Sequence, residues 1–248
     1  MKTMKKTVQM GLLLVGVAGL SATASAETQY APANFDFSGE KLLAAMPQET
    51  RSMQDSAVVY CQSEVSDKGV AERSQCYDKE GRDALVTNTE KALATLKFTP
   101  AEVDGKAVPV RMSFRVGFVP QNDAVSVVLI PNLGSMQAQY GRDYIAPQER
   151  LDVSDWYQRY SEQSWVRGDS FLGDGALSRV AATVSEKGET SMVRALDSER
   201  AYKRDVNLVK NAVKRSSFIP GFVDGRPVPM GYLAVVNYEQ NGEAVSSR

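Results

Sequence analysis

The sequence predicts an α+β fold of two tandem β-β-α-β units, in which each unit is a small antiparallel sheet covered by one helix. Three observations predict this architecture: a segment that occurs twice, runs of β-prone residues around glycine turns, and an apolar helical stripe after each pair of runs. The 248 residues suffice for two domains of ordinary size. We expect a signal peptide over residues 1–26, a first domain over 27–132 and a second domain over 133–248.

The N-terminal residues match a secretory signal peptide. Three lysines precede the apolar stretch Met10–Leu20, and Ala24-Ser25-Ala26 fits a cleavage site. The apolar stretch is about half of the ~20 residues that span a bilayer, which favours cleavage over a retained membrane anchor. We therefore expect a periplasmic protein whose mature chain starts at Glu27.

One segment of the chain occurs twice. Residues 98–110 return 120 residues later as 218–230, with seven of the 13 positions identical. Backbone and packing roles explain the shared residues: the phenylalanine anchors the end of a helix in the core, the first proline ends the helix, and Asp-Gly forms a turn in which glycine adopts a positive φ. These residues are Phe98, Pro100, Asp104 and Gly105 in the first copy, and Phe218, Pro220, Asp224 and Gly225 in the second.

Further correspondences extend both copies. Ser66-Asp-Lys-Gly69 and Ser185-Glu-Lys-Gly188 indicate a hairpin turn in each copy, and Tyr30-Ala-Pro32 is similar to Tyr144-Ile-Ala-Pro147 near the start of each. Apolar residues at helical spacing follow each hairpin. The expected strands are Ala57–Val65, Val70–Tyr77, Val110–Val119 and Val125–Ile130 in the first copy, and Leu177–Val184, Glu189–Leu196 and Tyr232–Tyr238 in the second.

Cys61 and Cys76 are predicted to form a disulfide. They lie on the two arms of the first hairpin, and a two-residue link, Lys68-Gly69, places them directly opposite each other. Opposed residues of a non-hydrogen-bonded antiparallel pair have Cα atoms about 4.5 Å apart, which is within disulfide range. The matching positions of the second copy hold Val180 and Ala195, an apolar pair, which favours a structural staple over a redox-active dithiol.

The amino-acid composition excludes several classes of function. The chain contains no histidine and only two cysteines, which excludes Ser-His-Asp and Cys-His nucleophilic sites, histidine-ligated zinc and cysteine-rich metal sites. Removal of the leader moves the formal net charge from −1 to −4, and an acidic protein lacks the basic face that nucleic acid requires. Carboxylate pairs such as Asp152/Asp155 lie in polar stretches typical of solvated loops. We therefore expect no enzymatic activity, metal, cofactor or nucleic-acid partner.

The order of these motifs resembles the C-terminal periplasmic domain of TonB-type energy transducers. The resemblance rests on the hairpin with its Asp-x-Gly turn and on Ala92-Leu-Ala-Thr-Leu-Lys-Phe-Thr-Pro-Ala-Glu-Val-Asp-Gly-Lys-Ala-Val-Pro-Val110, of which the second copy keeps the Phe-x-Pro and Val-Asp-Gly-Arg-Pro-Val-Pro parts. It implies domains that bind an envelope protein, such as the periplasmic segment of an outer-membrane receptor, by adding a strand to a sheet edge. Because the leader reads as cleavable and the 10 prolines are scattered, protein binding is implied rather than force transmission.

The expected binding surface is the backbone of the last strand in each copy, because edge strands expose unpaired N–H and C=O groups. Two other interpretations stay open: a structural periplasmic protein whose copies pack on each other and leave no ligand surface, and an accessory of TonB-like energy transduction. The candidate residues of the binding edge are Val110, Arg111 and Val116 in the first copy, and Tyr232, Val235 and Tyr238 in the second.

Overall fold

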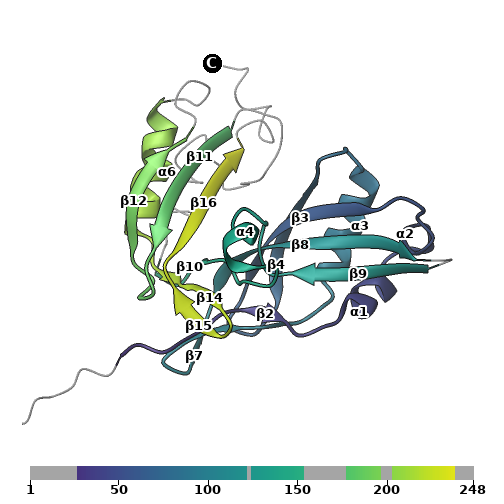
Figure 1. Cartoon of the computed structure of the whole chain (residues 1–248), viewed down its shortest axis with the longest axis horizontal. Helices are drawn as coiled ribbons and strands as arrows, with labels where there is room; N and C mark the ends of the chain where they lie inside the picture. The colour runs from purple at the N-terminus through teal and green to yellow at the C-terminus, as the bar shows by residue number, and fades with distance from the viewer. Residues whose placement is uncertain (1–26, 122–123, 154–176, 197–202, 238–248) are drawn as a thin grey trace, which may run out of the picture.

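The computed structural model describes residues 27–121, 124–153, 177–196 and 203–237, and it is mostly β (Figure 1). The described strands form five antiparallel sheets, one of which joins strands from both halves of the chain. Below, the first copy means residues 30–130 and the second copy means residues 144–237. The prediction of two α+β units, each a small sheet under one helix, is therefore wrong.

The largest sheet has six strands in the order β13-β10-β8-β3-β4, with β9 also paired to β8. It is larger than the predicted sheet because β9 forms a hairpin with β8 and because the second copy contributes β10 and β13. Helix α3 contacts β3 and β4, helix α1 contacts β9, and the two helices touch each other, so they cover one face. These strands are β3 (Ala57–Val65), β4 (Ala71–Asp78), β8 (Val110–Gln121), β9 (Ala124–Ile130), β10 (Gln148–Arg150) and β13 (Phe218–Ile219). The helices are α1 (Gly39–Ala44), α2 (Gln48–Arg51) and α3 (Asp83–Leu93).

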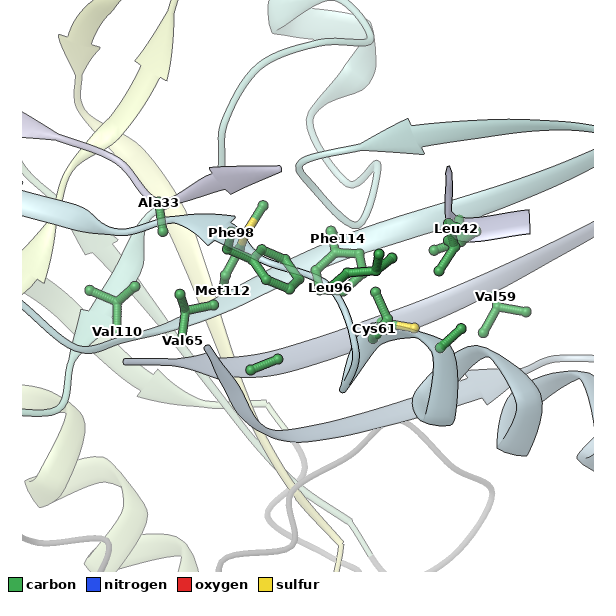
Figure 2. Packing of buried hydrophobic residues seen from close by; sticks show 14 of the residues in the cluster. Ala33, Leu42, Val59, Cys61, Val65, Leu96, Phe98, Val110, Met112 and Phe114 are labelled. Carbon is green, nitrogen blue, oxygen red and sulfur yellow. The ribbon is translucent and has the colours of Figure 1, made fainter. Parts of the chain in front are cut away.

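Alternation along β3 builds the core of the first copy. Every second residue from Ala57 to Val65 is buried, as expected when one face of a strand is covered by helices. Phe98 and Phe114 lie in the same core, with ring centroids 6.1 Å apart (Figure 2). Phe35 adds an edge-on contact to Phe114 at 5.2 Å. Burial of each such ring stabilises the fold by roughly 2 kcal/mol.

The second copy has a sheet of its own in the order β12-β11-β16. Helix α6 contacts all three strands. Val209 and Val213 of this helix are buried in a cluster that also holds Phe218 and Tyr232, whose rings meet edge-on at 4.6 Å. The elements are β11 (Leu177–Val184), β12 (Thr190–Ala195), α6 (Lys203–Arg215) and β16 (Met230–Asn237).

Short strands around the repeated motif form the remaining sheets, in the orders β1-β6-β7, β2-β5 and β14-β15. The two-residue turns Asp104-Gly105 and Asp224-Gly225 join β6 to β7 and β14 to β15, with φ of 51° and 74° in each, as a type I′ turn requires. These strands are β1 (Tyr30–Ala31), β2 (Asn34–Phe35), β5 (Phe98–Thr99), β6 (Ala101–Val103), β7 (Lys106–Val108), β14 (Gly221–Val223) and β15 (Arg226–Val228).

The prolines of the motif do not end the helices, contrary to the prediction. Helix α3 ends at Leu93 and α6 at Arg215, several residues before Pro100 and Pro220. Each proline instead lies between two short strands, where its missing N–H removes no bond from a regular ladder.

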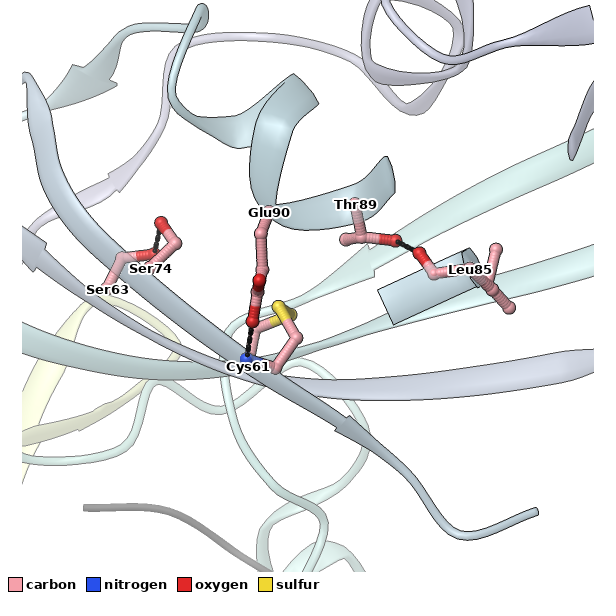
Figure 3. The surroundings of a disulfide bond; sticks show 7 residues. Cys61, Ser63, Ser74, Leu85, Thr89 and Glu90 are labelled. Atoms are coloured by element: carbon pink, nitrogen blue, oxygen red, sulfur yellow. Dashed lines mark hydrogen bonds between the residues drawn. A yellow bond between two sulfur atoms is a disulfide. The ribbon is translucent and has the colours of Figure 1, made fainter. Parts of the chain in front are cut away.

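The predicted disulfide between Cys61 and Cys76 is confirmed, with a Cα–Cα distance of 4.1 Å (Figure 3). The turn that aligns the two cysteines differs from the prediction. Ser66 and Val70 close a three-residue loop, since the Ser66 N–H donates to the Val70 carbonyl at 2.9 Å. A bulge next to Glu64 then restores the register that a two-residue turn would have given.

The same turn recurs in the second copy and meets the Phe-x-Pro segment in both. Gly69 has φ of 71° and Gly188 has φ of 73°. Their carbonyls accept the N–H groups of Phe98 at 2.8 Å and Phe218 at 3.0 Å. A Cβ at either glycine would collide with the carbonyl of the facing phenylalanine. The positive φ and the close approach together explain glycine at both turns.

The predicted signal peptide, residues 1–26, lies outside the described residues. Among the described helices, none is long and apolar enough to cross a membrane.

Candidate functional site

Strand β8, the first predicted binding strand, is paired on both sides along most of its length. β3 pairs with residues 110–118 on one side. On the other side β10 pairs with Val110 and Arg111, and β9 pairs with residues 115–121. Val110 and Val116 are fully buried. The expected open edge over Val110–Val119 is therefore covered at residues 110, 111 and 115–119, by the start of the second copy and by β9. Between them, residues 112–114 have no strand partner on this side among the described residues.

Strand β16, the second predicted binding strand, is paired on one side only within the described residues. β11 pairs with it from Met230 to Asn237. Tyr232 lies in this strand with its side chain buried against Phe218, so this side chain is not part of an exposed edge. Val235 lies in the same strand, whereas Tyr238 falls outside the described residues.

The backbone bonds of the β11–β12 hairpin show which groups of β16 point outward. The Ser185 N–H and the Arg179 carbonyl both bond toward β12, at 2.8 Å and 2.7 Å. Since backbone groups alternate along a strand, the even-numbered residues of β11 bond toward β16. Their partners on β16 are also even-numbered. The residues of β16 that direct N–H and C=O groups away from β11 are thus Gly231, Leu233, Val235 and Asn237.

A hollow of about 250 Å³ lies beside the first residues of this edge. Tyr60 and Tyr77, which face each other across β3 and β4, line its far wall. The Lys79 ammonium lies 4.9 Å from the centre of the Tyr60 ring, a cation–π distance. A second hollow of about 570 Å³ also borders Gly231–Leu233 and is lined by Met136 and Met192 among others. Apolar and aromatic side chains therefore flank the edge.

Helix α4 (Gln137–Tyr140) approaches the start of the edge. The Tyr140 hydroxyl donates to the Pro229 carbonyl at 3.2 Å. In the first copy the matching carbonyl, that of Pro109, accepts a backbone N–H from Leu151 at 2.9 Å. A side chain thus binds, in the second copy, the acceptor that an added strand binds in the first.

A row of charged side chains, of which Arg111 and Glu149 are buried, joins the two copies. Arg111 donates to Glu149 at 2.8 Å and to Glu64 at 2.9 Å, and Glu64 also accepts from Arg73 at 2.7 Å. The side chains of Arg111 and Glu149 are only 5% and 3% exposed. Glu149 further accepts from the Ser216 hydroxyl at 2.7 Å. The Arg111–Glu149 pair therefore bridges β8 of the first copy and the core of the second.

Electrostatics at this junction favour charged side chains. Burial alone would raise the pKa of Glu64, but the guanidinium groups of Arg111 and Arg73 outweigh burial and hold the pKa below its ordinary value. Arg111 was predicted as part of a binding edge, and the structure instead places it inside the protein with both carboxylates as partners.

Sequence reasoning missed the aromatic hollow and the role of Glu149. The repeat offered one signal for Glu149, because the alignment of Tyr30 with Tyr144 places it where the first copy has Phe35. An acid at an aromatic core position indicates a buried partner. For the hollow there was no such signal, since Tyr60 and Tyr77 come together with Tyr144 only in the folded chain.

Comparisons of the chain with protein-family models, with curated proteins and with solved structures found no match. The resemblance to the TonB C-terminal domain therefore rests on the motif residues alone. Among the described residues, no group of three or more acidic or cysteine side chains could hold a metal ion.

Proposed function

We propose that this chain is an exported protein-binding module that acts in the periplasm and takes an extended segment of an envelope protein onto the outward edge of β16. One observation carries the proposal: β16 has a strand partner on one side only within the described residues, whereas its counterpart β8 is covered on both sides along most of its length. The flanking hollows supply apolar walls for alternate side chains of an added strand. The TonB-like motif supports the same mode of binding.

A proline scan of the edge tests the proposal. The N–H of Val235 points outward, so Val235→Pro removes a donor that an added strand needs while the bonds to β11 stay in place. Ala195→Pro is the matched control at the opposite edge of the same sheet. Ala195 pairs with Val180, whose backbone bonds point toward β16. The N–H of Ala195 therefore faces away from β11. A photo-reactive residue at Leu233, which is 37% exposed, reports the partner in intact cells.

The expected result is one or more reproducible crosslinks that Val235→Pro reduces at least tenfold and Ala195→Pro leaves unchanged. Crosslinks that survive Val235→Pro, or that both prolines reduce equally, would contradict strand addition at β16. Reproducible absence of any crosslink at Leu233 would favour the structural interpretation, in which the chain has no ligand surface.

A further inference from the structure

We infer that the first residues of the β16 edge bind a second copy of this chain through residues 35–37, in the same way that β8 binds β10 within one molecule. The inference rests on the proposed strand addition at β16 and names a partner for its first residues. It concerns a head-to-tail contact, in which the end of one molecule meets the start of the next.

The contact between β8 and β10 provides the geometry. Glu149 pairs with Arg111 and Arg150 with Val110. The ladder continues by one bond, from the Leu151 N–H to the Pro109 carbonyl at 2.9 Å. The start of the second copy is thus an added strand on β8, the counterpart of β16.

The start of the first copy has the same local structure as β10. Asn34 pairs with Thr99 as Gln148 pairs with Ile219, and Phe35 pairs with Phe98 as Glu149 pairs with Phe218. Upstream, Ala31 pairs with Glu102, as Ile145 pairs with Phe222. Strand β2 is therefore the counterpart of β10. The residues that would face Gly231 and Pro229 of another molecule are Phe35 and Phe37.

The backbone of Phe35 points in the direction that such a contact requires. Phe98 directs its N–H to Gly69, so its neighbour Thr99 bonds toward β2 and pairs with Asn34. Phe35 then faces away from β5, as Glu149 faces away from β13 toward β8. Within the described residues, β2 has no second strand partner.

Side chains satisfy two of the backbone groups that the contact would use. The Phe35 N–H donates to the Asn34 side-chain oxygen at 2.9 Å, and the Pro229 carbonyl accepts from the Tyr140 hydroxyl at 3.2 Å. Both are exchangeable substitutes for a strand partner, since each can be replaced by one backbone bond of the ladder.

The proposed contact and the internal β8–β10 contact differ in the pair of side chains that face each other. Where β8 and β10 oppose Arg111 and Glu149, the proposed contact opposes Gly231 and Phe35. The Phe35 ring is packed against Phe114, and a side chain at position 231 would lie on the same face of the new pair. Glycine presents no side chain of its own to Phe35, and an aromatic residue across the strand pair is an arrangement used to stabilise glycine-containing edges. The nearest described atom to a Cβ at position 231 would be the Met136 sulfur, at 3.5 Å.

The contact is expected to be weak. Ile219 and Phe222 of the second copy are buried in the core of the first, with 0% and 6% exposure. Their counterparts in the first copy are Thr99 and Glu102, which are polar. The proposed contact therefore has strand pairing without this apolar part, and we expect a dissociation constant on the order of 100 μM. Because the contact is head-to-tail, it extends into chains of molecules rather than closing as a dimer.

Sedimentation velocity of the protein exported with its own leader tests the inference, from about 10 μM to 1 mM, the range that brackets the expected constant. The weight-average sedimentation coefficient should rise with concentration. Gly231→Pro should lower the association at least tenfold, whereas Ala195→Pro should not change it. Tyr140→Phe, which frees the Pro229 carbonyl, should strengthen association a fewfold. Thr99→Ile with Glu102→Phe restores the apolar pair and should strengthen it at least tenfold, and Gly231→Pro should reverse that gain. Circular dichroism verifies that each variant is folded.

A sedimentation coefficient that does not rise up to 1 mM would overturn the inference, as would association that Gly231→Pro leaves unchanged in both backgrounds. The proposed function fails independently, because Val235 lies outside the three-residue contact. Partner crosslinks that depend on Val235, in a chain that stays monomeric, would keep the function and remove the second copy as partner. Self-association that depends on Gly231, without Val235-dependent crosslinks, would support the second copy as partner and contradict the proposed function.

Discussion

The two copies of the repeat agree at their turns and differ in how their sheets are held together and covered. Both keep the glycine turn that receives the Phe-x-Pro segment and both keep an Asp-Gly turn with positive φ. The first copy adds a disulfide, an aromatic cluster and a strand β8 that is paired on both sides along most of its length. The second has an apolar pair, a buried acid and, in the part of the chain that the structure describes, a strand β16 with a partner on one side only. Backbone geometry thus dictates the shared residues, while the remaining positions determine stability and available surface.

We expect the largest loss of stability from a substitution that removes the ion pair between the two copies. Arg111→Met removes the cation that faces the buried Glu149 carboxylate and also one partner of Glu64. An uncompensated buried charge costs about 3–5 kcal/mol, so the free energy of unfolding in urea should fall by that amount. The double variant Arg111→Met/Glu149→Leu should recover most of the loss, because apolar side chains of similar size replace a buried ion pair at little cost. A single variant that loses less than about 1 kcal/mol would show that water reaches the pair.

The next largest loss of stability is expected when the disulfide of the first copy is replaced by the apolar pair of the second. Cys61→Val/Cys76→Ala installs the pair that stands at the matching positions, Val180 and Ala195. The disulfide closes a loop with a sequence separation of 15, for which chain entropy predicts a loss of about 3 kcal/mol. The reverse exchange, Val180→Cys/Ala195→Cys, should form a disulfide under oxidising conditions, as mass spectrometry with and without reductant would show. Two free thiols there would mean that the second hairpin does not hold the register of the first.

Sequence reasoning located strands and turns better than it located their partners. Alternation and glycine placement gave β3 and β11 with their observed ends, and they gave the opposition of Cys61 and Cys76. These features depend on residues close in sequence. The six-stranded sheet depends instead on β10 and β13, which are two or three residues long and have no period to detect.

The candidate site was predictable in part for the same reason. The sequence named Tyr232 and Val235 in β16. Val235 directs its backbone groups outward, whereas Tyr232 directs them toward β11. The covering of β8 depends in part on the second copy, which contributes β10, whose paired residues lie 38 and 40 positions further along the chain. The aromatic hollow forms where three distant segments meet, so no local pattern indicates it.

A smaller loss of stability is expected from alanine substitutions at two kinds of glycine in each copy. One kind requires only a positive φ, and the other also lies close to a facing carbonyl. Gly69 and Gly105 both have positive φ, at 71° and 74°. A Cβ at Gly69 would collide with the Phe98 carbonyl, whereas at Gly105 no described atom lies within 4 Å of it. Gly105→Ala should therefore cost only the conformational strain, roughly 1–2 kcal/mol, and Gly69→Ala should cost more. Thermal unfolding of the two variants measures the difference, and the pair Gly188→Ala and Gly225→Ala should repeat it. Equal losses would show that the turn shifts to accommodate the new side chain.

The smallest effect contrasts two partly buried carboxyls of the first copy by their dependence on pH. The Glu90 carboxyl faces the Cys76 N–H beside the disulfide, and burial raises its pKa more than this bond lowers it (Figure 3). The pKa of Glu64 is instead held below its ordinary 4.5 by Arg111 and Arg73. A lowered folded-state pKa stabilises the protein above pH 4.5 and stops doing so as the pH falls through the folded value. A raised pKa makes stability fall as the pH rises from 4.5 through the folded value. Glu64→Gln should therefore destabilise the protein at pH 7 and less so at pH 4, whereas Glu90→Gln should stabilise it slightly at pH 7 and have no effect at pH 4. Urea unfolding at the two pH values measures both, and effects of the same sign at pH 7 would contradict the opposite environments of the two side chains.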